Sequence, residues 1–160
     1  MISGLAQAAQ ALQDREIHKL AERAALFIKK NMYKEDSSTL IRSYREGASN
    51  IEGFLDDYAF LIQGLLDLYE SQPNDSWIEW ADELQKRQDD VFYDTKNSGY
   101  FGVAETDKSI LLRMKDGKYL AKYEMEWSKN WFVSFLNRKR WGRTIWVQYP
   151  KHNSVNYQVY

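Results

Sequence analysis

GFLDDYAFLIQGLLDLYE, residues 53 to 70, carries apolar side chains around almost the whole circumference of a helix in its last fifteen positions. A helix that is hydrophobic on every face is typical of a buried position in a protein core. The stretch nevertheless opens with two adjacent carboxylates, Asp56 and Asp57. These acids either stabilise the start of the helix or belong to a reaction site, and both readings stay open at this point.

The overall composition is that of a globular protein. The chain has 160 residues, of which 44% are hydrophobic and 28% charged, and no apolar run approaches the roughly 18 residues that a membrane span needs. It has no cysteine and two histidines, so we expect no thiol chemistry, no metal site and no cofactor. The N-terminus lacks the pattern of a signal peptide. We therefore expect a soluble protein with a cytoplasmic location by default.

The same order of elements occurs twice in the chain: two helices, then a turn and short strand-like runs. Apolar residues recur at helical spacing in four segments, which we expect to be helices: residues 2–12, 14–33, 54–70 and 76–94. A turn and short strand-like runs follow each pair, at residues 34–47 and 95–115. The sequence thus predicts a mainly α fold of two helical hairpins with short β loops. Such arrays usually need three or more units, and the first helix begins without a capping segment, so we expect the chain to be cut from something longer.

Five motifs in this region resemble one known family in order and spacing: SGLAQAAQAL (3–12), LAERAALFI (20–28), GFLDDYAFLIQGLLDLYE (53–70), FYDTKNSGYF (92–101) and LLRMKD (111–116). The resemblance is to the spermatogenesis-associated protein 20 family and covers about residues 1–116. It implies two hairpins of an incomplete (α/α)6 toroid, without the thioredoxin-like domain that precedes the toroid in the family. It also implies similarity to six-hairpin glycosidases and N-acylglucosamine epimerases, which bind sugars at the mouth formed by the inner helices.

This resemblance gives the two acids a second interpretation beside helix capping. At the start of an inner helix, Asp57 and Asp56 would hold sugar hydroxyls or an acid catalyst in the complete toroid. Neighbouring helical residues point about 100° apart, so the pair cannot face each other across one glycosidic bond. A second acid must come from another segment, and Glu52 could approach Asp56 only if the helix began early. We therefore expect no catalysis by this chain alone.

Four further residues form the predicted ligand-binding set: Arg42, Tyr58, Tyr100 and Arg113. Guanidinium groups and an aromatic platform on the loops after each hairpin would suit a polar ligand. The structural alternative is that Tyr100 and Phe101 close the end of the barrel, while the arginines pair with carboxylates such as Asp57. The sequence favours this alternative.

Polar and aromatic residues inside the helices have structural interpretations. His18 falls on the charged face of its helix, and we expect it to be solvated. Asp67 and Gln63 interrupt a buried helix, and such groups more often bond to neighbouring backbone than act in catalysis. Trp77 and Trp80 have the spacing of residues that pack against a neighbouring hairpin.

The last part of the chain has a different character. Residues 1–114 hold 13 basic and 20 acidic residues, whereas residues 115–160 hold 9 basic and 3 acidic ones. The resemblance stops after Asp116, and Gly117-Lys118-Tyr119 can be encoded by a sequence that contains the consensus of an intron's 5′ end. We expect residues 117–160 to be a divergent basic and aromatic tail, from a translated intron or an alternative exon, with a helix near 119–137 and strands near 144–149.

Two functional hypotheses follow. In the first, the chain forms part of a carbohydrate site in the full-length protein. In the alternative, it is a structural or protein-interaction module of a thioredoxin-like protein. The expected partners are a carbohydrate, the missing domains of a longer protein or another protein. The tail combines cations with aromatics, a composition found in single-strand nucleic-acid platforms and membrane-surface segments, but we expect neither a nucleic-acid nor a membrane partner.

Overall fold

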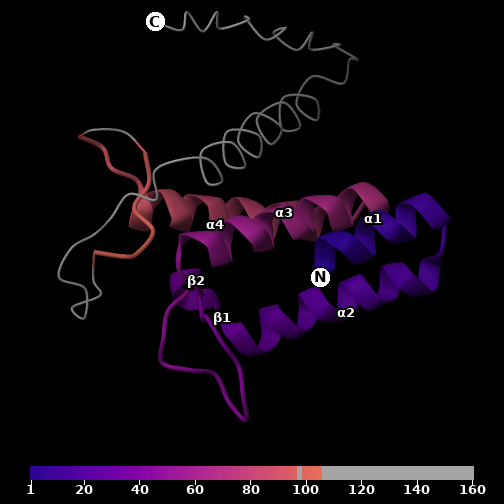
Figure 1. Ribbon diagram of the computed structural model, residues 1–160, viewed down its shortest axis with the longest axis horizontal. Helices are drawn as coiled ribbons and strands as arrows, with labels where there is room; N and C mark the ends of the chain where they lie inside the picture. The colour runs from indigo at the N-terminus through magenta and orange to yellow at the C-terminus, as the bar shows by residue number, and fades with distance from the viewer. Residues whose placement is uncertain (97–98, 106–160) are drawn as a thin grey trace, which may run out of the picture.

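The computed structural model describes residues 1–96 and 99–105. Within them the fold is mainly α, as the sequence predicts, with one small two-stranded sheet (Figure 1). The elements in chain order are α1 (Ile2–Leu12), α2 (Arg15–Met32), β1 (Tyr33–Lys34), the 3-10 helix η1 (Glu35–Ser37), β2 (Thr39–Leu40), α3 (Leu55–Ser71) and α4 (Asp75–Phe92).

Side-chain caps explain where two of the helices begin. The carboxylate of Asp14 accepts hydrogen bonds from the backbone N–H groups of Glu16 and Ile17, at the start of α2. The amide oxygen of Asn74 accepts from the backbone N–H of Ser76, at the start of α4. Both residues satisfy N–H groups that lack partners inside the helix. The observed bounds of all four helices agree with the predicted ones to within two residues.

Helix α3 lies at the centre of the helical arrangement. It packs against α1 and α4 and also contacts α2, while α1 and α2 form an antiparallel hairpin (Figure 1). Gly64 permits the close approach of α1, because a Cβ atom at this position would lie 3.3 Å from the Cβ of Ile2. The two hairpins therefore join through their first helices, α1 and α3.

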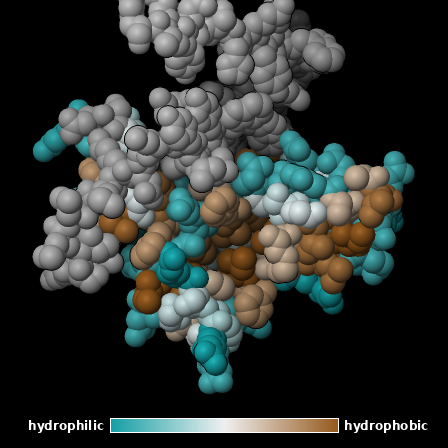
Figure 2. Space-filling view, in the orientation of Figure 1, coloured by the Kyte–Doolittle hydropathy of each residue, from teal (hydrophilic) through white to brown (hydrophobic). Residues whose placement is uncertain are grey.

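One continuous hydrophobic core connects the four helices. Its largest fully buried side chains include Trp80, Tyr58 and Phe92. The indole ring of Trp80 meets the ring of Tyr33 edge to face, with centroids 5.4 Å apart. The contact of Trp80 with Tyr33 confirms its predicted packing against the other hairpin, and Trp77 is buried in the same core. In Figure 2 apolar residues form a band along the helices, bordered by hydrophilic ones.

His18 is buried against α3, and the prediction that it is solvated is wrong. Only 4% of the residue is exposed. Its Nδ1 lies 2.8 Å from the hydroxyl of Ser71, which itself donates to the carbonyl of Leu68. This contact ties α2 to the last turn of α3. The charged neighbours of His18 in the sequence concealed this inward-facing position.

The strand-like run predicted at residues 39–47 is only partly regular. Thr39 and Leu40 pair with β1, and the remainder makes isolated bridges, including the one between Ile41 and Glu52. Positive φ angles of 57° at Glu46 and 155° at Gly47 turn the chain back on itself. A backbone conformation that glycine favours therefore ends the extended run.

Several predictions fall outside the described residues. These are Arg113, the strand-like run up to residue 115, the helix near 119–137 and the strands near 144–149. Across residues 1–96 and 99–105, no helix is both long and apolar enough to cross a membrane.

Candidate functional site

Asp57 stabilises the first turn of α3. Phe54 is the N-cap residue, and its backbone N–H donates a hydrogen bond of 2.8 Å to Oδ2 of Asp57. Asp57 is the third helical residue, the position from which a carboxylate can reach back to the N-cap. The negative charge also meets the positive end of the helix dipole. The capping role is therefore present in the structure.

Arg42 contacts the same carboxylate from the preceding loop. Its Nη1 donates to Oδ2 of Asp57 over 3.3 Å, and its guanidinium carbon lies 4.0 Å from the centroid of the Phe54 ring. The Arg42 side chain is 43% exposed and that of Asp57 32%, so the pair contributes little more than about 1 kcal/mol to stability. Its main effect is to place the loop beside the start of α3.

Tyr58 points into the core. The residue is 2% exposed, and its hydroxyl oxygen accepts a 2.9 Å hydrogen bond from the backbone N–H of Leu40. Burial raises the pKa of the Tyr58 hydroxyl, and hydrogen bonds from Leu40 and Arg87 oppose this shift. In this arrangement Tyr58 links α3 to the small sheet.

Tyr100 lies near the same end of the molecule but is directed to α4. Its hydroxyl donates a 2.5 Å hydrogen bond to Oδ1 of Asp89. Burial and this carboxylate raise the pKa of Tyr100 above its ordinary value. The backbone N–H of Leu55 donates to the carbonyl of Gly102, which holds the 99–105 segment beside the start of α3. The structure thus brings Arg42 to Asp57, whereas the hydroxyl of Tyr100 is bonded to another helix.

A narrow exposed stripe runs along α3. Between Leu55 and Leu68 the exposed residues are Asp56, Phe60 and Gln63, and spacings of four and seven residues put them on one helical face. Phe60 is 61% exposed. A large aromatic ring left in solvent between a carboxylate and an amide combines the apolar and hydrogen-bonding groups that ligand sites need.

The stripe continues onto α1 through Asp67. This carboxylate is 8% exposed and accepts hydrogen bonds from the hydroxyl of Ser3, from Gln7 Nε2 at 3.2 Å and from Gln63 Nε2 at 3.0 Å. Its partners are side chains on α1 and α3, so the expectation of backbone partners for Asp67 and Gln63 is corrected. The network fixes the amides of Gln7 and Gln63 at one edge of the stripe.

Sequence reasoning missed Phe60 and Gln7. The signal for Phe60 was available, since positions 56, 60 and 63 share a helical face and two of them are polar. Gln7 could not be found in this way, because its contribution depends on how α1 packs against α3.

The described residues offer no metal centre. Among residues 1–96 and 99–105, no group of three or more histidine, aspartate or glutamate side chains could hold a metal ion. The stripe can therefore be described from its aromatic, amide and carboxylate groups alone.

Comparison with known proteins gives a consistent set of relatives. The chain is 41% identical to spermatogenesis-associated protein 20 of Rattus norvegicus and 38% identical to that of Homo sapiens, in each case over 125 residues and 72% of the chain. It is 40% identical over 121 residues to an uncharacterised protein of Caenorhabditis elegans. The matched segment spans only 16% of the length of each of these relatives. No model of a known protein family matches the chain.

Proposed function

The chain belongs to the spermatogenesis-associated protein 20 family over the segment that it shares with these relatives, and we propose that it contributes two adjacent hairpins to a six-hairpin toroid. In this arrangement α1 and α3 are inner helices and α2 and α4 are outer ones. The contacts between α1 and α3 support the proposal, because they join the two hairpins through their first helices. In this proposal the remaining hairpins and a thioredoxin-like domain would lie in the parts of the full-length relatives that the match does not cover.

The proposed function is to form one wall of a carbohydrate site in the complete protein. The exposed stripe of Asp56, Phe60 and Gln63 is the observation that carries it. The ring of Phe60 offers an apolar platform for the face of a sugar ring, while carboxylate and amide groups beside it can bond to hydroxyls. Arg42 and Asp57 form the polar rim at the start of α3.

Catalysis by this chain alone is not part of the proposal. A glycosidase needs two carboxyl groups, about 5 Å apart for retention or about 6.5 to 9.5 Å apart for inversion. Asp57 already accepts hydrogen bonds from Phe54 and Arg42. The side chain of Asp56 points about 100° away from that of Asp57 around the helix axis, so the two carboxylates cannot act on one bond together. A catalytic partner would have to come from the rest of a full-length relative.

A glycan array with the full-length rat relative tests the sugar proposal, followed by calorimetric titration of the best ligand. Alanine at the positions aligned with Phe60 and Gln63 should weaken binding by roughly tenfold or more, with an unchanged melting temperature. Alanine at the position aligned with Tyr44, an exposed aromatic on the loop after β2, is the matched control. The proposal fails if no glycan binds, or if the control loses as much affinity as the two stripe variants.

A structural or protein-interaction module is the second candidate. It is favoured by the partners of the predicted site residues, since the hydroxyls of Tyr58 and Tyr100 are bonded to Leu40 and Asp89. Affinity purification of the full-length rat relative should then recover one specific protein partner that binds without any sugar. A full-length relative that binds glycans but no protein would argue against this candidate.

A further inference from the structure

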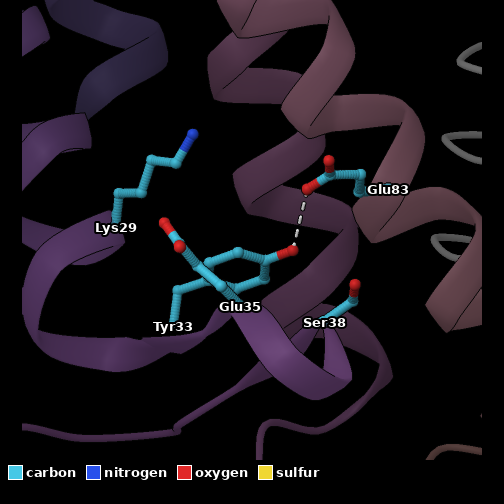
Figure 3. A pocket seen from close by; sticks show the side chains of 5 residues that line it. All are labelled: Lys29, Tyr33, Glu35, Ser38 and Glu83. Atoms are coloured by element: carbon cyan, nitrogen blue, oxygen red, sulfur yellow. Dashed lines mark hydrogen bonds between the residues drawn. The ribbon is translucent and has the colours of Figure 1, made fainter.

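A polar cavity lies between α2, the β1–β2 hairpin and α4. Its volume is about 370 Å³, within the range of roughly 300 to 1,000 Å³ that is usual for small-molecule sites. The residues that line it come from α2, the β1–β2 hairpin and α4: Lys29, Tyr33, Glu35, Ser38 and Glu83 (Figure 3). None of them belongs to the stripe on α3, so this cavity is independent of the carbohydrate proposal.

Tyr33 fixes the shape of the cavity. The residue is 8% exposed, and its ring is held edge to face against Trp80. Its hydroxyl donates a 3.0 Å hydrogen bond to Oε2 of Glu83, which positions that carboxylate at one wall (Figure 3). Burial raises the pKa of Tyr33, so the hydroxyl keeps its proton at neutral pH. One oxygen of Glu83 thus has a fixed donor from the protein.

The tight turn of the β1–β2 hairpin contributes Glu35 and Ser38 to the lining of the cavity. Ser38 has a left-handed backbone, with φ 49°, and closes η1 through a hydrogen bond to the carbonyl of Glu35. In Figure 3 the carboxylates of Glu35 and Glu83 lie on opposite sides of the Tyr33 ring, and the Lys29 ammonium lies above it.

Charges of both signs are available in the cavity. Among the described residues, neither Lys29 nor the two cavity glutamates forms an ion pair. Lys29 places its ammonium 5.2 Å from the centroid of the Trp80 ring instead. On the neighbouring surface of α4, by contrast, Lys86 pairs with Asp82 over 2.7 Å. One cation and two carboxylates therefore line the cavity without pairing with one another.

We infer that this cavity binds a free α-amino acid. The ligand's ammonium group would lie between Glu35 and Glu83, and its carboxylate would meet Lys29. A metal ion does not fit this part of the described structure, which offers no group of three suitable ligands. Glu35 and Glu83 are both exposed to solvent, so the choice of ligand rests on matching charges: a zwitterion meets both signs, whereas a simple amine makes no contact with Lys29 and a simple carboxylate makes none with the glutamates.

The first test uses the complete 160-residue chain, labelled with ¹⁵N and titrated with a panel of L-amino acids that have neutral side chains. At least one should shift the backbone amide signals of Tyr33 and Ser38 to saturation. Its analogues without the ammonium or without the carboxylate should each bind about tenfold more weakly. The inference is overturned if no amino acid gives saturable shifts, or if one of the analogues binds as tightly as the amino acid.

Matched variants then locate the binding site. Lys29→Met and Glu83→Gln should weaken binding by about tenfold or more, and the glutamine can still accept the hydrogen bond from Tyr33. Lys30→Met and Glu79→Gln change exposed residues that do not line the cavity, and they should bind within about twofold of the unchanged chain. If thermal melting shows that Glu83→Gln is unfolded, Glu35→Gln replaces it. Equal affinity in cavity variants and controls would rule the site out.

Discussion

At the scale of single residues, Asp57 shows how one carboxylate can have several structural roles. Its Oδ2 accepts from the backbone N–H of Phe54 and from Arg42. The sequence predicted both of these roles as alternatives to chemistry. Asp56, the adjacent acid, is exposed on the stripe with Phe60. The two acids therefore differ in environment although they are neighbours in the chain.

We expect Asp57→Ala to lower the free energy of unfolding by about 1 to 2 kcal/mol, because it removes a helix cap and an ion pair. Asp57→Asn keeps an oxygen that can accept from Phe54 but loses the charge, so its effect should be smaller. Urea unfolding of the two variants measures the difference. Equal losses would mean that the hydrogen bond to Phe54 adds nothing beyond the charge.

Tyr100 contributes to the free energy of unfolding in a way that weakens at alkaline pH. Its folded-state pKa is raised by burial and by Asp89, so its contribution is complete below the unfolded pKa of about 10 and is lost as pH rises further. We expect Tyr100→Phe to be less stable near pH 8, with a gap to the unchanged chain that shrinks toward pH 11. Urea unfolding across this range measures the gap. A constant gap would contradict the account.

Some residue environments could not be predicted from local sequence. The carbonyls, hydroxyls and rings around His18 and Tyr58 come from segments far away in the chain, including Ser71 and Leu40. Periodicity identifies which face of a helix is apolar, but it does not identify the neighbour that satisfies a buried polar atom. The pairing of Arg42 with Asp57 was predictable because opposite charges stood at adjoining element ends.

At the scale of elements, the close approach of α1 and α3 joins the two hairpins. Gly64 makes it possible, since a Cβ atom there would already lie 3.3 Å from the Ile2 side chain. The helices themselves were predictable because their apolar periodicity is long and strong. The short strands were less so, because pairing between Tyr33 and Leu40 depends on a turn with a left-handed residue, Ser38.

Gly64→Leu should therefore push the two helices apart and destabilise the fold by about 1 to 3 kcal/mol. Gly4→Leu on α1 is the matched control, because no atom lies within 4 Å of a Cβ atom at that position. The control should be as stable as the unchanged chain or slightly more stable, since leucine is the better helix former. Thermal unfolding compares them. Similar stabilities for both variants would contradict the packing of α1 on α3.

At the scale of the whole molecule, the four helices share one hydrophobic core. We therefore expect the two hairpins to unfold together. In a urea titration followed by ¹⁵N NMR, amide signals from α2 and α4 should disappear with the same midpoint. Separate midpoints would show that each hairpin is an independent unit and that the contacts between α1 and α3 are weak.

The sequence of this segment does not identify a ligand or a reaction. The stripe on α3 is exposed in the described part of the chain, and the match covers only 16% of the length of the rat relative. If the proposed site is built from several segments, this segment alone does not predict the reaction. The family was predictable because five motifs that resemble it occur in order within residues 3–116. The helical hairpins were predictable from the apolar periodicity of the same segment.

We propose that α1 and α3 are inner helices and that the exposed stripe on α3 lines a ligand site. The most direct measurement is a structure of the full-length rat relative at a resolution that defines side chains. We expect the residues aligned with Asp56, Phe60 and Gln63 to face an open central cavity. Burial of the Phe60 position against another helix or domain would contradict it.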